Sequence, residues 1–132
     1  MRGTSRDPER VAELDRGGIE GVLADPARVG TLASALEHVG VVIVLLGSAV
    51  GSDAELRELH RPRLQMLMTR ILDTTVRGVL YEGTGTVEAS VLGAGAALVQ
   101  EFCEHSRIPY AVIERVQDPQ PALDEVDRLL NR

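Results

Sequence analysis

Gly47, Ser48 and Ala49 are the residues of this sequence that are best placed to do chemistry. They directly follow residues 41–46 (VVIVLL), an apolar run without alternation whose first four residues are β-branched. Such a run is typical of a strand buried on both faces, as in a parallel sheet between layers of helices. Ligands of these sheets bind just beyond the carboxyl ends of the strands. The sequence therefore predicts a site over residues 47–52, although a tight exit from the strand would favour Gly47 as strongly as a close approach of a ligand.

Other residue types that act as nucleophiles or metal ligands are scattered. His38, His60 and His105 are far apart, each in or near the expected end of a helix, where surface or capping roles are favoured over metal binding. Cys103 falls on the apolar face of an expected helix, where a cysteine is more often a small core residue than a nucleophile. We therefore expect no metal site and no catalytic cysteine.

The charge distribution argues against a nucleic-acid partner. The formal net charge is −6, and all 14 basic residues are arginine, because the sequence contains no lysine. No segment makes a basic face. Arg57, Arg61, Arg63 and Arg70 share one expected helical region, but acidic residues alternate with them, so this strip is interpreted as a solvated face.

Size and cysteine content limit the class of protein further. A chain of 132 residues suits one domain with a real core. Cys103 is the only cysteine, so no internal disulfide can form and a reducing cytoplasm is the expected location. No run of about 18 apolar residues is present that would cross a membrane.

The elements that would position these residues alternate between strands and helices. Helix starts are predicted at Asp7-Pro8, at Asp25-Pro26 and at Ser52, where Glu55 completes the spacing of a capping box. Pro62 either kinks the helix that follows Ser52 or separates two helices near His60. One α/β domain over residues 1–132, with a three-layer and mostly parallel sheet, is predicted. Strands are expected over residues 1–5, 19–24, 41–46, 76–81 and 110–116, and helices after residue 7, over 29–36, after 52, over 96–105 and after 119.

The order of these segments resembles the NAD(P)-binding core of the atypical short-chain dehydrogenases/reductases, with NmrA-like and epimerase-like members nearest. The resemblance is carried by residues 2–8 (RGTSRDP), 18–26 (GIEGVLADP), 35–39 (ALEHV), 41–46 and 108–113 (IPYAVI). It covers nearly the whole chain, and the order and spacing of the motifs are more specific than any one of them. The implied fold is a Rossmann-like α/β sheet.

The resemblance implies a cofactor site at the end of the first expected strand. In that family, basic residues there meet the adenosine ribose or its 2′-phosphate, and Arg2 and Arg6 match them, with Thr4 and Ser5 as hydroxyl partners. The fork of guanidinium donors fits phosphate oxygens, which favours NADP over NAD. The alternative is that both arginines are solvated charges.

Two further cofactor contacts follow from the same resemblance. Asp25 matches the residue that contacts adenine, although an aspartate before a proline is also a helix N-cap. Gly47, Ser48 and Ala49 match the turn that lies against the ribose of the cofactor.

The catalytic residues of the family have no full counterpart. Its reductases use a Tyr and a Lys four residues apart, and this chain has no Lys. Tyr81 and Tyr110 lie on expected strands. Glu82, as a base, and Thr84, as a hydroxyl in the loop with Thr86, are the substrate-site candidates. Whether the chain is an enzyme stays open, and reductase catalysis is not expected of it.

The Gly-rich turn that cradles the pyrophosphate in the family also lacks a counterpart, so cofactor binding is expected to be weak or absent in this chain. Residues 93–98 have a similar spacing, but Leu98 stands where a small residue belongs, and they are interpreted as a flexible lead into a helix. Because the first strand is central in the order 3-2-1-4-5-6, a gap is expected in the middle of the sheet, and the fold is expected to be N-terminally truncated.

Buried strand edges cost about 1–3 kcal/mol for each unsatisfied group. We therefore expect that residues 1–15 and the strand over residues 19–24 dock differently, that a partner chain fills the gap, or that the natural chain begins further upstream, which is the preferred explanation.

Two functions are consistent with the sequence. The first is an NAD(P)-binding protein of the atypical reductase type. The alternative is a non-enzymatic α/β module that binds a partner, or a second copy of itself, through an exposed sheet edge or its Arg/Glu helix. A flavodoxin-like or receiver-like domain is disfavoured, because Asp25 alone does not supply the acidic cluster of a receiver.

Overall fold

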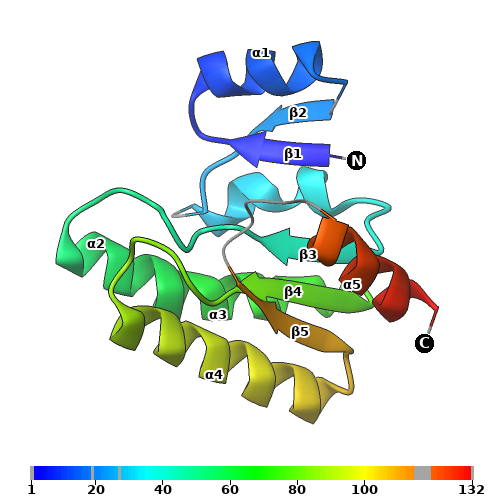
Figure 1. Ribbon diagram of the computed structural model, residues 1–132. Coiled ribbons are helices and arrows are strands. Elements are labelled where there is room, and N and C mark those ends of the chain that lie inside the picture. Colours follow the sequence, from blue (N-terminus) through cyan, green and yellow to red (C-terminus); the bar gives the residue numbers. More distant parts are fainter. Residues whose placement is uncertain (1, 19, 27, 115–119, 132) are drawn as a thin grey trace.

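A computed structural model describes residues 2–18, 20–26, 28–114 and 120–131. Strands alternate with helices along these residues (Figure 1). The first half contains β1 (Arg2–Ser5), α1 (Pro8–Arg16), β2 (Glu20–Leu23), the 3₁₀ turns η1 (Val29–Leu32) and η2 (Ser34–Leu36), and β3 (Val41–Val44). The second half contains α2 (Asp53–Glu58), the π turn η3 (Leu59–Arg63), α3 (Leu64–Ile71), β4 (Gly78–Glu82), α4 (Ala89–Ser106), β5 (Tyr110–Ile113) and α5 (Gln120–Leu130).

The strands form two sheets, and every ladder in them is parallel. β1 pairs with β2, and Arg2 lies opposite Glu20. The larger sheet has the order β3-β4-β5, in which Val41 lies opposite Gly78 and Val79 opposite Tyr110. Parallel strands joined by helical crossovers confirm the predicted α/β class.

The expected gap lies between β1 and β3. Within the described residues these strands belong to different sheets, although they run in the same direction in Figure 1. The side chain of Arg2 connects β1 to the end of η2. Its guanidinium Nη1 donates to the carbonyl oxygens of Ala35 (2.9 Å) and Glu37 (2.8 Å). The gap expected in the sheet is therefore present between β1 and β3 within the described residues.

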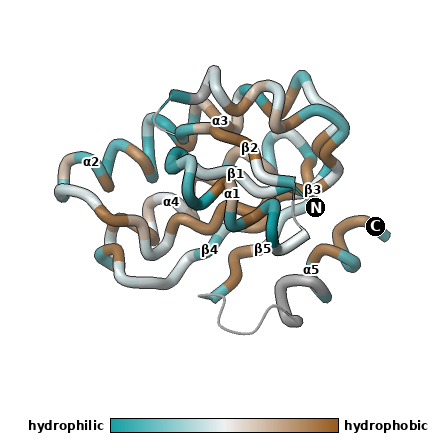
Figure 2. Tube along the Cα trace, turned by 90° about the horizontal axis from the view of Figure 1, so that it is seen from above, coloured by the Kyte–Doolittle hydropathy of each residue, from teal (hydrophilic) through white to brown (hydrophobic). Residues whose placement is uncertain are grey.

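Helices cover both faces of the larger sheet. A core of fully buried side chains lies between the sheet and the helices α3 and α4, and includes Met68, Ile71, Val79, Val99 and Cys103. The other face is covered by α5, whose Leu129 packs beside Gly78. In Figure 2, α3 and α5 lie on opposite sides of the strands. This is the three-layer arrangement expected from the sequence.

The apolar run at residues 41–46 is less buried than predicted. The strand ends at Val44, which is buried, whereas Val41 and Val42 are half-buried. Leu45 is 52% exposed. The expectation of burial on both faces is therefore wrong for most of the run, because β3 is an edge strand of its sheet rather than a central one.

The predicted helix over residues 29–36 is wrong in type. Two short 3₁₀ turns replace it, and the first of them begins after Arg28 rather than at Asp25-Pro26. The Thr31 hydroxyl donates to the Arg28 carbonyl (2.7 Å) and accepts from the Asp25 amide (2.8 Å). Such side-chain bonds to nearby backbone compete with regular α-helical bonds.

The helix that contains Pro62 is continuous, and two separate helices do not form. Ser52 and Glu55 make the predicted capping box at its start. At residues 59–63 the helix widens into a π turn, which accommodates Pro62, since proline lacks an amide hydrogen and its ring clashes with the preceding turn of an α-helix. The wide turn places His60 inside the protein.

Residues 93–97 are part of the interior of α4, so the interpretation as a flexible lead into a helix is wrong. The helix begins at Ala89, well before the expected start at residue 96. Gly95 is needed there for packing, because a Cβ atom at this position would lie 2.1 Å from the Tyr81 hydroxyl. From the sequence alone, a glycine that lets another side chain approach the helix backbone cannot be told from a glycine that interrupts the helix.

The packing of Tyr81 against α4 predicts opposite effects for two glycines of this helix. Gly95→Ala should lower the free energy of unfolding by about 1–3 kcal/mol, because the new methyl group overlaps Tyr81. The matched control is Gly93→Ala, at an exposed position with no atom within 4 Å of the new Cβ. It should raise the free energy by about 0.5–1 kcal/mol through helix propensity. Urea denaturation measures both, and equal effects would contradict the packing described here.

Candidate functional site

The loop after β3 is tied to the end of β4 at Gly47. The Gly47 amide donates to Glu82 Oε1 (2.8 Å), and its carbonyl accepts from the Val87 amide (3.0 Å). A Cβ atom at Gly47 would lie 2.3 Å from the Thr84 carbonyl oxygen. The close neighbour that requires glycine here is therefore the adjacent loop, and both backbone polar groups of Gly47 are used within the chain.

The loops after β3 and β4 interlock over the next residues. Ser48 Oγ accepts from the Thr86 amide (3.2 Å). Gly85 has a φ of +157°, and a Cβ atom there would lie 2.1 Å from the Gly47 carbonyl oxygen. Ser48 and Ala49 are half-buried, whereas Thr84 and Thr86 are exposed. The two loops thus form one compact edge with several polar groups at its surface.

Glu82 lies beneath this edge. Its exposed fraction is 6%, and its carboxylate accepts the Gly47 amide. A carboxylate in this position organises the loop by accepting a backbone donor that would otherwise be buried without a partner. The sequence suggested Glu82 as a base, and the structure places it as a support of the loop.

A buried histidine and tyrosine lie on the other side of the same loop. His60 and Tyr81 are 1% and 0% exposed. His60 Nε2 is 2.9 Å from the Leu46 carbonyl oxygen, and His60 Nδ1 is 2.6 Å from the Tyr81 hydroxyl. A carbonyl oxygen only accepts, so Nε2 carries the hydrogen, and Nδ1 accepts the hydrogen of the Tyr81 hydroxyl.

This pair is neutral at physiological pH. Burial lowers the pKa of His60 below its usual value of 6.5, although the bond to Leu46 and the negative charge of Glu82 act in the opposite direction. Burial, with a further contribution from Glu82, raises the pKa of Tyr81 to about 12. The expectation that His60 has a surface or capping role is wrong. The signal in the sequence for the burial of His60 was its position two residues before Pro62. The π turn that accommodates this proline changes which side chains of the helix face the core.

The predicted phosphate ligands Arg2 and Arg6 differ in surroundings. Arg2 Nε lies 3.1 Å from Glu20 Oε2, and Nη1 donates to two carbonyls of η2. Arg6 follows the end of β1 and is exposed. The pKa of Glu55, at the start of α2, is lowered by hydrogen bonds from Ser52 and also by the positive charge of Arg6. Arg6 is thus within electrostatic range of the start of α2.

The remaining predicted cofactor residues lie near the ends of β1 and β2. Thr4 is exposed, and Ser5 Oγ accepts from the Asp7 amide (3.1 Å). Asp7 caps α1 as predicted, by accepting from the Glu9 amide (3.0 Å). Asp25 follows the end of β2 and is half-buried, so it lies at the carboxyl end of its strand as expected.

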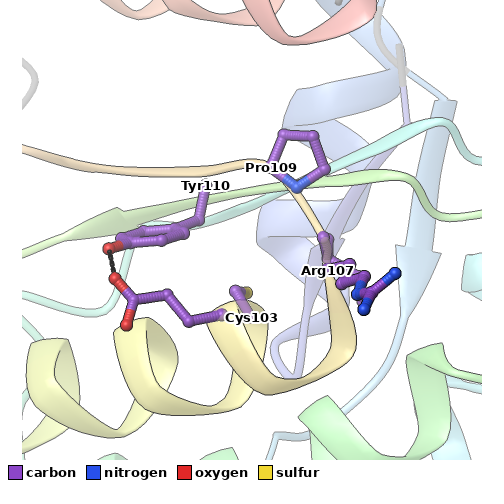
Figure 3. A pocket seen from close by; sticks show the side chains of 6 residues that line it. Cys103, Arg107, Pro109 and Tyr110 are labelled. Atoms are coloured by element: carbon purple, nitrogen blue, oxygen red, sulfur yellow. Dashed lines mark hydrogen bonds between the residues drawn. The ribbon is translucent and has the colours of Figure 1, made fainter.

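A hollow lies at the amino end of β5, away from the loops described above (Figure 3). It is lined by residues that include Cys103, Arg107 and Tyr110, and the Tyr110 hydroxyl donates to Glu104 Oε1 (2.9 Å). Burial raises the pKa of the Cys103 thiol to about 11, so this cysteine stays protonated. The prediction that Cys103 is a core residue is confirmed.

The residues that the structure describes contain neither a metal-binding cluster nor a membrane-spanning helix. No group of three or more His, Cys, Asp or Glu side chains is arranged to hold a metal ion. None of the helices there combines the length and the apolar character needed to span a bilayer.

Comparison with known proteins identifies the fold. No family model matches the sequence, and no curated protein matches it. Solved structures do match, among them two structures of triphenylmethane reductase from Citrobacter sp., one of them a crystal structure of the complex with NADP(H). They have TM-scores of 0.64 and 0.63 at 19% identity, and each match covers 84% of this chain and 38% of the reductase chain. The predicted Rossmann-like fold is confirmed, and the chain spans 38% of the length of these reductases.

The buried His60 predicts a loss of stability in acid. The folded chain binds a proton at His60 less readily than the unfolded chain does, so the unfolded state holds more protons as the pH falls below 6.5. This contribution to stability is complete above that pH and is lost as the pH drops through the lower pKa of the folded state. His60→Gln should remove this part of the pH dependence of the free energy of unfolding. His105→Gln, at an exposed histidine of α4, should leave it unchanged.

Thermal or urea unfolding between about pH 5 and pH 8 measures the effect. If wild type and His60→Gln have parallel stability curves over this range, the histidine does not titrate differently on folding, and the neutral pair is contradicted.

Proposed function

We propose that this chain is an NAD(P)-binding Rossmann-like domain of the atypical short-chain dehydrogenase/reductase type, with a preference for NADP over NAD. The support is the fold that it shares with a reductase whose structure contains NADP(H). In open α/β sheets ligands bind outside the carboxyl ends of the strands. The compact edge of Gly47, Ser48 and Thr86 lies at that end of the larger sheet.

The observation that carries the preference for NADP is the position of Arg6, which is exposed and directly follows β1. Its guanidinium is thus available at the carboxyl end of this strand. A planar fork of donors suits the oxygens of a 2′-phosphate, and Thr4 and Ser5 supply hydroxyl groups next to it.

We assign different roles to the two arginines predicted from the sequence. Arg2 has its donors on Glu20, Ala35 and Glu37, so its proposed contribution is to hold β1 beside η2. Arg6 is the proposed ligand of the phosphate. Asp25 stays the proposed contact of adenine.

Ser48 and Ala49 are the proposed contacts of the ribose, and Gly47 fixes their position from below. Thr84 is exposed on the interlocked loop and is the proposed substrate-side hydroxyl, next to Glu82. The affinity for the cofactor is expected to be weak, because residues 47–49 and Arg6 contribute only the adenosine side of such a site.

Reductase catalysis is not part of this proposal. A Tyr–Lys pair cannot form within these residues, since no lysine is present. Tyr81 donates its hydroxyl hydrogen to the buried His60, and its pKa of about 12 keeps it protonated. Tyr110 is bonded to Glu104 at the opposite end of the sheet.

The alternative function is a non-enzymatic module that associates with itself. It is supported by the division between β1 and β3 and by two exposed apolar side chains beyond β3, Leu45 (52% exposed) and Val50 (88% exposed). Exposed strand edges pair readily with other strands. Sedimentation with and without NADPH separates the two functions, since self-association without cofactor binding supports only this alternative.

Replacing Arg6 tests the proposed phosphate contact. Arg6→Ala should weaken NADPH binding by about 10- to 100-fold, because a hydrogen bond to a charged group is worth about 1.5–3 kcal/mol. NADH binding should change little, since NADH lacks the 2′-phosphate. Arg10→Ala, at an exposed arginine of α1, is the matched control and should leave both affinities unchanged.

Fluorescence or calorimetric titration up to millimolar cofactor measures these affinities. Equal losses for Arg6→Ala and Arg10→Ala would show a general effect of charge and refute the assignment of Arg6. A wild-type chain that binds neither cofactor would refute the proposed function for these residues.

A further inference from the structure

His60 contacts the proposed cofactor loop from the side opposite to Glu82. Its Nε2 hydrogen is donated to the carbonyl of Leu46, which immediately precedes Gly47. Glu82 accepts the amide of Gly47. The Leu46 carbonyl also accepts from the Ala49 amide (3.2 Å) within the loop. The peptide group between Leu46 and Gly47 is therefore held at its oxygen by His60 and by the loop itself, and at its nitrogen by Glu82. Rotation of this peptide would break all three bonds.

Three features bring the imidazole to this peptide. The π turn at residues 59–63 turns His60 inward, and Tyr81 orients the ring by donating to Nδ1. Gly95 leaves room for the Tyr81 hydroxyl, because any side chain at this position would overlap it. The rings of His60 and Tyr81 meet edge to face, with centroids 5.9 Å apart. The tautomer and the direction of the Nε2 hydrogen are both fixed by this arrangement.

We propose that His60 is a positioning residue for cofactor binding: its Nε2 hydrogen bond to Leu46 sets the orientation of residues 47–49, and protonation of the ring breaks the Tyr81 hydrogen bond that orients it. This inference rests on the proposed function, since residues 47–49 are the proposed ribose contact. It adds two things to that function. His60 supports the binding loop without touching the cofactor, and the affinity for the cofactor depends on pH.

The surroundings explain why protonation opposes the arrangement. A cationic ring would place a second hydrogen, on Nδ1, against the hydroxyl of Tyr81, which would have to turn and lose its own acceptor. Burial opposes the cation, whereas Glu82 of β4 favours it. Arg57 and Arg61, on the same helix as His60, line a hollow beside it.

On the side of α4 the nearby charge is Glu88, just before the helix, which lies 4.0 Å from Arg57. The α4 residues that line the hollow, Ser90, Val91 and Ala94, carry no charge. The balance of burial and charge keeps the ring neutral above its lowered pKa.

Two substitutions separate hydrogen bonding from simple packing. His60→Phe keeps a ring of similar shape but removes both hydrogen bonds. His60→Gln retains a donor that can reach the Leu46 carbonyl but cannot titrate. His105→Gln, far along α4 and exposed, is the matched control. Circular dichroism and thermal unfolding of each variant establish that it is folded.

The first measurement needs no cofactor. Backbone amide spectra of the intact chain should show displaced signals for Gly47 and Ser48 in His60→Phe, and wild-type positions in His60→Gln. Long-range nitrogen–proton spectra of wild type should show the hydrogen on Nε2 of His60. Unchanged Gly47 and Ser48 signals in His60→Phe, or a hydrogen on Nδ1, would overturn the inference.

The second measurement is NADPH affinity between about pH 5 and pH 8. Wild-type affinity should fall as His60 becomes protonated. His60→Phe should bind about tenfold more weakly than wild type at neutral pH, and His60→Gln should bind as well as wild type with no fall in acid. His105→Gln should follow wild type throughout. Equal affinities for wild type and His60→Phe, or a fall in acid that persists in His60→Gln, would overturn the inference.

The two proposals fail in different ways. If NADPH does not bind to wild type but the amide signals change as expected, the proposed function is wrong and the placement of the loop by His60 stands. If NADPH binds and His60→Phe changes neither measurement, the proposed function stands and the role of His60 is wrong. Should His60→Phe fail to fold, the pH profile of His60→Gln against wild type decides the question alone.

Discussion

The hydrogen bond from the Gly47 amide to the buried carboxylate of Glu82 is the interaction on which the carboxyl edge of the larger sheet depends. Where the chain leaves a strand, its backbone N–H and C=O groups lose their partners in the sheet. If these groups are buried, they need other hydrogen-bond partners. Here one side chain from the neighbouring strand and one from the covering helix, His60, provide the partners. The polar groups left at the surface of the edge are consequently held in fixed positions, which is the state that a binding site needs before its ligand arrives.

Much of the architecture could be predicted from local signals in the sequence. The proline after Asp7 and the Ser52–Glu55 spacing gave correct helix starts, because these signals act through neighbouring backbone groups. The apolar run at residues 41–46 predicted the position of the loop after β3. The run does not alternate between apolar and polar residues, and this pattern correctly indicated a parallel sheet. Predictions of this kind succeed when the responsible contacts lie within a few residues of one another.

The failures have a common physical cause, which is contact between residues far apart in sequence. Gly95 lies in a helix because Tyr81, fourteen positions earlier, needs the space, and no local rule reports this. His60 was expected at the surface, and its partners Leu46 and Tyr81 come from two other elements. Arg2 was expected to keep its donors for a phosphate, but carbonyls of η2, more than thirty residues away, accept them. That residues 47–49 follow a parallel strand could be predicted, whereas the partners of the candidate residues could not.

The division of the strands into two sheets has a consequence for the dynamics of the molecule. No side chain of β1, α1 or β2 among the described residues is fully buried, whereas the larger sheet packs against a core of fully buried side chains. Segments with few buried contacts open at a lower free energy than the core, so amide exchange in residues 2–18 should be faster than in β4. Arg6 belongs to the segment that opens, and Ser48 belongs to the part that does not. A ligand that contacts both would suppress the opening, because it would bind only while the two segments are together.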